Sequence, residues 1–363
     1  MIRWIVVLTA LAVASHAGAE LLVYDGFDYT QGANLGGQIN PILSQPWGKG
    51  SSGNDTTIGT ENLAVAGLAA PAGNSVLLSG ANTSNGVVDR ISPGGTGNFS
   101  TGTLYYSLVF KVTDMAGLST AETGIFFAGF NNSAPTATQG VTRACARLQM
   151  RTSLLDPARF QLGVRTDNVA AFPSTIAWDE TRDFAVGETI FVVAAYEFNK
   201  TVDPDPMNDD VAKIWIKPDP GTFGAADPPV APLTSTGSDI SQLQIQSFFL
   251  RQVDVAPTVT VVDELRNGTS WADVTPPGAP ACNEPRFDVD GDHDVDGNDF
   301  AAYQRCYTGD GDPSGAYDAE ACRCLNSDSE TDIDLTDLVS FAACASGPSV
   351  PADAACDDAL PPP

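Results

Sequence analysis

The stretch Leu104-Tyr-Tyr-Ser-Leu-Val-Phe-Lys-Val112 decides the fold class of this 363-residue chain. Its polar and apolar residues alternate, and aromatic and β-branched residues dominate it, so it predicts a β-strand. Six further runs of the same kind follow: Ile125–Phe130, Phe160–Arg165, Ile190–Phe198, Ala212–Lys217, Leu243–Leu250 and Thr258–Leu265. Turn formers separate these runs and no long helical period interrupts them, which predicts an antiparallel two-sheet sandwich of the jelly-roll type.

The chain is strongly acidic, with 45 Asp and Glu against 18 Lys and Arg and a formal net charge of −27. Such a chain repels phosphate polymers and anionic membrane surfaces, so we expect no nucleic-acid partner and no binding to such a membrane. The acid is unevenly spread, because residues 282–358 alone carry 19 acidic residues against three Arg, a net charge of −16. The hydrophobic fraction of 43% is enough for a globular core.

Residues 1–19 have the pattern of a secretory signal peptide, with Arg3 at its start, an apolar run over 4–14 and Ala17-Gly-Ala19 as the cleavage site. No later stretch is long enough to span a bilayer, so we expect a secreted, extracellular or cell-surface protein. Six of the seven Cys lie in the acidic region, which predicts disulfides, although six Cys allow 15 pairings. Cys145 stands apart and is interpreted as a buried small hydrophobe.

Composition also predicts the domain boundaries. After the signal peptide, residues 20–275 form the predicted sandwich, and residues 276–285 form a Pro-rich linker. Residues 286–358 form a small C-terminal domain, and 359–363 a frayed tail. Once the signal peptide is removed, the chain keeps one histidine, His293, which excludes a multi-histidine zinc site.

The C-terminal domain contains a repeat with an offset of 38 residues. Residues 288–299 and 326–337 are twelve-residue loops with oxygen-bearing side chains at places one, three, five, nine and twelve. Calcium prefers six to eight hard oxygen ligands, and this spacing wraps them around one ion, with the seventh residue supplying its carbonyl. Each loop precedes a predicted short amphipathic helix, with Phe300, Tyr303 and Cys306 on one face in the first copy and Leu338, Phe341 and Cys344 in the second.

This repeat resembles the type I dockerin, a module of paired EF-hand-like calcium loops and helices. The resemblance implies two Ca²⁺ ions and a cohesin-like or other envelope protein as partner. The implied ligands of the first loop are Asp288, Asp290, Asp292, Asp294 (main chain), Asp296 and Asp299, and those of the second are Asn326, Asp328, Glu330, Asp332 (main chain), Asp334 and Asp337. The sixth place, usually Gly because the backbone turns there through positive φ, holds His293 and Thr331. We therefore expect the second site to be weaker.

The sandwich region resembles the concanavalin A-like, laminin G-like jelly rolls of exported bacterial proteins. The resemblance is carried by Leu22–Tyr29, Val262–Val274, Phe191–Phe198 and Lys213–Pro218. Proteins of this fold include lectins, glucanases and structural modules, so the fold alone does not assign a function.

The sandwich offers few candidate groups for chemistry. Glucanases of this fold carry their acids in a Glu-x-Asp-x-x-Glu string, which is absent here. Adjacent acids such as Asp209-Asp210 are interpreted as loop or edge residues, and Asp25 and Asp263 as candidates for a structural cation. Trp47 and Trp178 lie beside turn-rich sequence and are the candidates for stacking on sugar rings.

These observations favour a secreted, non-catalytic modular protein whose sandwich binds carbohydrate or protein and whose tail binds calcium. No catalytic residue is predicted. Two alternatives stay open: a polysaccharide hydrolase or lyase whose carboxylates come from different strands, and a structural envelope component.

Overall fold

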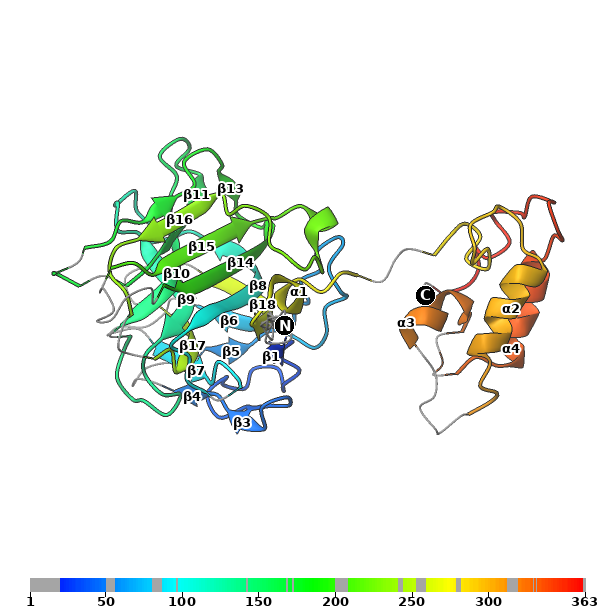
Figure 1. Cartoon of the computed structure of the whole chain (residues 1–363), viewed down its shortest axis with the longest axis horizontal. Coiled ribbons are helices and arrows are strands. Elements are labelled where there is room, and N and C mark those ends of the chain that lie inside the picture. The colour runs from blue at the N-terminus through cyan, green and yellow to red at the C-terminus, as the bar shows by residue number, and fades with distance from the viewer. Residues whose placement is uncertain are drawn as a thin grey trace, which may run out of the picture. The chain divides into compact units, whose positions relative to one another are not determined.

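The computed structural model describes residues 20–49, 56–79, 87–95, 97–141, 143–167, 169–171, 173–199, 208–240, 244–252, 259–278, 282–311, 319–328, 330 and 332–361. The predicted signal peptide and Thr331 lie outside these residues. The chain divides into two compact units, Met1–Gly278 and Ala279–Pro363, and the division falls within the predicted Pro-rich segment (Figure 1).

The first unit contains two large antiparallel sheets, of which the first is built around its longest strand, β8. Its strands, in spatial order, are β16 (Leu233–Thr236), β15 (Val211–Ile216), β14 (Thr189–Phe198), β8 (Gly102–Asp114), β18 (Val259–Gly268), β6 (Val76–Leu78) and β5 (Thr57–Ile58), with β1 (Leu21–Asp25) also paired to β18. The β8–β14 ladder is unbroken over ten residue pairs, from Gly102 opposite Phe198 to Lys111 opposite Thr189.

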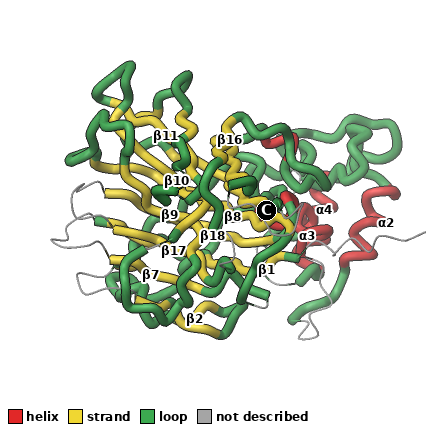
Figure 2. Tube along the Cα trace, turned by 60° about the vertical axis from the view of Figure 1, so that its left-hand side comes forward, coloured by secondary structure: helices red, strands yellow, loops and turns green. Residues whose placement is uncertain are grey.

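The second large sheet places β10 between β9 and β11, and Figure 2 shows β11, β10, β9, β17 and β7 lying next to one another. Its strands, in order, are β12 (Ala177–Trp178), β11 (Arg159–Arg165), β10 (Ala144–Thr152), β9 (Ile125–Asn131), β17 (Ser247–Gln252), β7 (Val87–Ile91) and β4 (Gly48–Lys49), with β13 (Phe184–Ala185) also paired to β11. A small two-stranded sheet joins β2 (Ile39–Asn40) to β3 (Gln45–Pro46).

The main core lies between the two large sheets, because one cluster of buried side chains contains residues of both. Tyr106 of β8 packs on Phe130 and Phe248 of the second sheet, with ring centroids 5.2 and 5.1 Å apart. The opposite face of the first sheet is covered by a second cluster that includes Trp215 and Trp271. The first unit is therefore mainly β, with two packed antiparallel sheets, consistent with the predicted jelly-roll sandwich.

Two short helical segments complete this unit. The 3-10 helix η1 (Pro220–Thr222) is capped by the Asp219 side chain, which accepts a hydrogen bond from Gly221 N. Helix α1 (Trp271–Val274) is closed by a capping box between Ser270 and Asp273.

The predicted strand runs correspond to observed strands with small shifts at their ends. Strand β17 begins at Ser247 rather than at Leu243, which lies outside the described residues, and β18 extends to Gly268. Strand β10 was not predicted, although it lies inside the second sheet, because it has few of the β-branched and aromatic residues that mark the other strands. Cys145 lies on β10 and is fully buried and unpaired, as expected.

The second unit has its own small core and four short helical segments: α2 (Gly297–Cys306), α3 (Ala319–Cys322), the 3-10 helix η2 (Arg323–Leu325) and α4 (Leu335–Cys344). Helices α2 and α4 lie side by side (Figure 1). They pack through Tyr303 and Phe341, whose ring centroids are 5.8 Å apart. All six Cys of this unit are paired, as Cys282–Cys324, Cys306–Cys322 and Cys344–Cys356. The predicted frayed tail is wrong for its first residues, because Leu360 packs on this core and the Pro361 carbonyl accepts a hydrogen bond from Arg286.

Within the described parts of the chain, no helix has both the length and the apolar character needed to cross a membrane.

Candidate functional site

Asp299 is the central residue of the first predicted calcium loop. It stands at the third position of α2, and its side chain is 1% exposed. Its Oδ1 atom accepts a hydrogen bond from Val289 N at 2.7 Å, and its Oδ2 atom accepts one from Asp296 N at 2.8 Å. The twelfth residue of the loop therefore binds backbone near both ends of the loop and closes it.

Five of the six predicted acidic residues of this loop lie in two carboxylate clusters that share Asp299. Asp288, Asp290 and Asp299 form one cluster, and Asp294, Asp296 and Asp299 form the other, with carboxylate oxygens within 4.8 Å of one another in each. Asp292, at place five, belongs to neither cluster, and its Oδ1 atom accepts a hydrogen bond from Asp294 N at 3.2 Å.

The crowding of these carboxylates has an electrostatic cost. Partial desolvation and the neighbouring charges of Asp292 and Asp299 raise the pKa of Asp290, and desolvation likewise raises the pKa of Asp294. The Asp294 side chain is 4% exposed, and its buried Oδ1 atom has no hydrogen-bond partner in the described structure. A hard cation would offset the repulsion and satisfy this oxygen, so the donor set fits calcium.

The turn of this loop occurs at His293, whose backbone φ is 73°. Its N–H donates to Asp288 Oδ2 at 3.0 Å, and its carbonyl accepts from Ala352 N at 3.0 Å. The backbone thus turns at the sixth place in the left-handed region that Gly would favour.

The second loop is closed by its twelfth residue in the same way as the first loop, but the acidic side chains described there do not form clusters. Asp337, 1% exposed, accepts from Ser327 N at 2.6 Å and from Asp334 N at 2.9 Å, as Asp299 does in the first loop. Asn326 at the first place donates its amide to the Glu330 carbonyl at 2.6 Å. No group of three acidic side chains converges in the described residues of this loop.

Glu330 and Asp332 are two further predicted ligands of the second loop. They have different surroundings in the structure. The repulsion of Asp328 and Asp332 raises the pKa of Glu330. Asp332 accepts a hydrogen bond from Gly311 N. The predicted main-chain ligand of this loop, Asp332, thus uses its side chain to hold the backbone at Gly311.

Trp47 is a core residue and not an exposed stacking platform, which corrects the prediction. Its side chain is 1% exposed, and its indole N–H donates to Asp25 Oδ2 at 2.8 Å. The Asp25 carboxylate also accepts from Phe27 N, the Tyr29 hydroxyl and the Asn40 amide. A carboxylate that is already surrounded by donors is a structural hydrogen-bond acceptor, so the cation predicted at Asp25 is not supported.

The cation predicted at Asp263 is not supported either. Its Oδ2 atom accepts from Leu63 N and its Oδ1 atom from Glu264 N, both at 2.8 Å. Burial raises the pKa of the Asp263 carboxyl to about 7.

Trp178 lies at the edge of the second sheet, but its ring is 8% exposed. The Arg151 guanidinium lies over the ring at 4.4 Å from its centroid, and the indole N–H donates to the Glu122 carbonyl at 3.1 Å. The ring also borders a pocket of about 520 Å³, together with Trp215, Arg182 and Lys217. Trp178 is therefore a support for Arg151 more than an open platform for a sugar ring.

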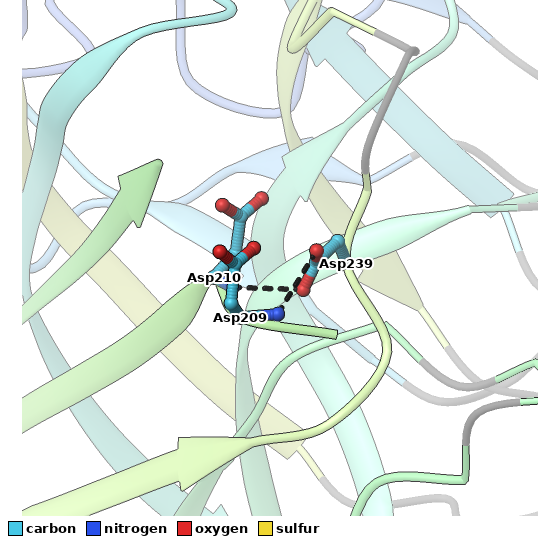
Figure 3. A group of neighbouring side chains, drawn as sticks. All are labelled: Asp209, Asp210 and Asp239. Carbon is cyan, nitrogen blue, oxygen red and sulfur yellow. Dashed lines mark hydrogen bonds between the residues drawn. The ribbon is translucent and has the colours of Figure 1, made fainter. Parts of the chain in front are cut away.

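A cluster that sequence reasoning missed joins Asp209 and Asp210 to Asp239 (Figure 3). The two Asp239 oxygens accept from Asp209 N at 3.1 Å and Asp210 N at 2.9 Å, and Asp210 Oδ2 accepts from the Tyr196 hydroxyl at 2.7 Å. Burial, with the nearby charge of Asp210, raises the pKa of Asp239 to about 7. The adjacent pair in the sequence could not indicate this cluster, because Asp239 approaches it only in the folded chain.

Comparison with known proteins gives no family for this chain. No family model matches it, and no curated protein does. Among solved structures, the chain is similar to the carbohydrate esterase vb_24B_21 from the Shiga toxin-encoding bacteriophage phi24B, at 14% identity and a TM-score of 0.36, over 70% of this chain and 100% of that one. It is also similar to the alginate lyase Aly36B (12%, 0.40, over 69% and 97%) and to the cellulose induced protein Cip1 (9%, 0.31, over 62% and 91%). Similarity at this level carries no information about activity.

Proposed function

We propose that this chain is a secreted, non-catalytic modular protein. Its dockerin-like C-terminal unit binds two calcium ions, and its sandwich binds polysaccharide. The three disulfides of the C-terminal unit support an extracellular location, because such bonds persist in oxidising compartments.

The observation that carries the calcium proposal is the buried Asp299 carboxylate, which two clusters of acidic side chains share in the first loop. Like charges packed so closely favour a bound cation, and oxygen ligands at this loop spacing suit calcium. The second loop has the same closure at Asp337 but an amide at its first place. Fewer charged ligands make its site the weaker of the two.

The proposed role of the C-terminal unit is to attach the sandwich to a cohesin-like or other envelope protein. Leu335 and Val339 of α4 are 64% and 71% exposed, and an exposed apolar pair on one helix is suited to contact a partner. A pulldown from envelope extracts with and without calcium tests this role.

Calorimetric titration with calcium tests the metal sites. The mature chain should bind two ions with different affinities. Asp299→Asn should abolish the tighter site and leave the weaker one, whereas Asp337→Asn should do the reverse. An unchanged stoichiometry of two in Asp299→Asn would overturn the assignment of the first loop.

A glycan panel tests the sandwich. We expect binding without product formation, because the sandwich sequence lacks the Glu-x-Asp-x-x-Glu string of the glucanases. Turnover that a single substitution in 20–275 abolishes would favour the alternative, a polysaccharide-degrading enzyme.

A further inference from the structure

Five arginines lie on one face of the second sheet, although the sandwich as a whole is acidic. We call this surface the arginine face, and its residues are Arg90, Arg147, Arg151, Arg165 and Arg251, with Gln149, Gln161, Phe126 and Trp178. It is the face turned away from the main core, because the alternate residues of the same strands, such as Leu148, Met150 and Leu162, belong to that core.

The register places these side chains in rows across the strands. Arg147 lies opposite Arg165, and Arg151 lies opposite Gln161. Gln149 lies opposite Gly163 on one side and Phe126 on the other. Because opposite residues in antiparallel strands project to the same face, the basic and amide groups form one continuous surface.

Aromatic rings hold three of the guanidinium groups in place. Arg151 lies over the Trp178 ring and Arg251 over the Phe126 ring, each at 4.4 Å, and Arg147 lies 5.3 Å from the Phe126 centroid. The guanidinium groups are thereby positioned before any ligand binds, which lowers the conformational entropy that binding removes.

Arg90 has a different role from the others. It is fully buried and donates to Asn131 Oδ1 and to the carbonyls of Ala137, Gln139 and Gly140. These bonds fix the loop after β9, so we assign no ligand to Arg90.

Three buried polar atoms of the arginine face have no hydrogen-bond partner in the described structure: Arg147 Nε, Gln149 Oε1 and Gln161 Nε2. The Gln149 and Gln161 side chains are 2% and 0% exposed. An unsatisfied buried polar atom is unfavourable, but Gln149 and Gln161 are too buried for a ligand to contact, so we assign no ligand to these amides.

The charge of this surface indicates an anion. Burial and the neighbouring charges of Arg165 and Arg251 lower the pKa of Arg147 to about 10. Arg151 is paired with Glu180, whose side chain is 67% exposed and therefore easily displaced. Along β10, Arg147 and Arg151 are separated by about 13 Å at the usual rise of a strand. One small anion cannot reach both, whereas a polymer with repeated charges can.

We propose that the arginine face binds a carboxylated polysaccharide, whose uronate groups pair with Arg147, Arg151 and Arg251. Guanidinium groups match carboxylates in bidentate geometry. This inference rests on the proposed polysaccharide binding of the sandwich and names its substrate class.

The test compares two ligands that differ only in charge. Hexagalacturonate and its fully methyl-esterified form are titrated calorimetrically into the mature chain. We expect the acid form to bind, with an affinity that falls as salt is raised, and the ester to bind at least tenfold more weakly. Equal binding of both, or preferential binding of sulfated or neutral glycans, would overturn the carboxylate assignment while leaving polysaccharide binding intact.

Variants then locate the site. Arg251→Gln and Arg147→Gln should each weaken binding of hexagalacturonate about tenfold, the loss of one charge-assisted pair. Lys213→Gln, which removes one positive charge from the first sheet, should change the affinity less than twofold. Equal effects of all three variants would place the binding elsewhere.

The remaining outcomes separate this inference from the proposed function. If no glycan of any charge binds but two calcium ions still do, the polysaccharide role of the sandwich fails together with this inference. If Arg147→Gln does not fold, as judged by its thermal transition, the half-buried Arg251 and the ester comparison still decide the question.

Discussion

His293 is the position at which the backbone of the first calcium loop is strained. A residue with a Cβ atom at φ 73° is strained by about 1 kcal/mol relative to Gly, yet the backbone bonds to Asp288 and Ala352 require the turn. The loop therefore keeps the geometry that the spacing implies, although the residue at the sixth place does not favour it.

We predict that His293→Gly raises the unfolding free energy of the C-terminal unit by about 1 kcal/mol, because it relieves this strain. His293→Ala, which removes the imidazole but keeps the Cβ atom, should bring no gain. Chemical denaturation in calcium-free buffer measures both. A gain in His293→Ala equal to that in His293→Gly would assign the effect to the imidazole and not to the backbone.

The raised pKa of Asp263 predicts that the stability of the sandwich depends on pH. Its pKa is raised to about 7 in the folded chain, against about 4 when unfolded, so the folded state holds a proton that the unfolded state has lost. Stability should therefore fall as the pH rises from about 4.5 to 7.5 and level off above that range. Asp239, also raised to about 7, adds to the effect with the same sign.

Thermal unfolding of the sandwich across this range measures the effect. Asp263→Asn should reduce the fall in stability without abolishing it, because Asp239 still titrates. The exposed Asp114→Asn serves as the control and should leave the slope unchanged. A wild-type stability that increases from pH 4.5 to 7.5 would contradict the argument.

At the scale of elements, the second unit depends on Arg286, which joins segments far apart in the sequence. Its guanidinium donates to the carbonyls of Cys324, Asn326 and Pro361, and its backbone N–H donates to Asp357. The side chain is 5% exposed. It thus connects the end of η2, the start of the second loop and the C-terminal segment.

We predict that Arg286→Gln destabilises the C-terminal unit by about 3 kcal/mol, because a shorter side chain leaves buried carbonyls without donors. It should also weaken calcium binding at the second loop more than at the first. Arg305→Gln, at an exposed position of α2, should change neither quantity. Denaturation and calcium titration of both variants provide the measurements, and equal weakening of the two sites in Arg286→Gln would refute the link to the second loop.

Strand β10 illustrates what pattern reading at this scale can miss. The sequence Arg147-Leu-Gln-Met-Arg151 alternates charged and amide residues with large apolar ones, which gives it little of the β-branched and aromatic character that marks the other strands. Its apolar half nevertheless faces the core, and its polar half forms the centre of the arginine face. The alternation of polar and apolar residues in this stretch is the feature of the sequence that could have predicted the strand.

At the scale of the whole molecule, the division into two compact units predicts two independent unfolding transitions. Chelation should lower the transition of the C-terminal unit, because its calcium-binding free energy contributes to its folding free energy. The sandwich transition should not move. Calorimetric scans of the mature chain with calcium and with chelator measure both.

Asp299→Asn provides the matched control for this experiment. Its C-terminal transition should respond less to chelator than that of the wild-type chain, while its sandwich transition stays the same. A sandwich transition that chelator lowers would instead place a cation within the sandwich, with Asp209, Asp210 and Asp239 as the first residues to substitute.

The sequence by itself determined the β-rich first unit, the boundary after it and the two loop-helix repeats, because strand alternation, turn formers and ligand spacing are local properties of the chain. Tertiary structure alone decided that Trp47 is buried on Asp25, that Asp239 joins Asp209 and Asp210, and which of 15 disulfide pairings is formed. It also decided that arginines of four different strands share one face. Each of these depends on contacts between residues distant in the sequence, which the register of the sheets fixes and no local pattern encodes.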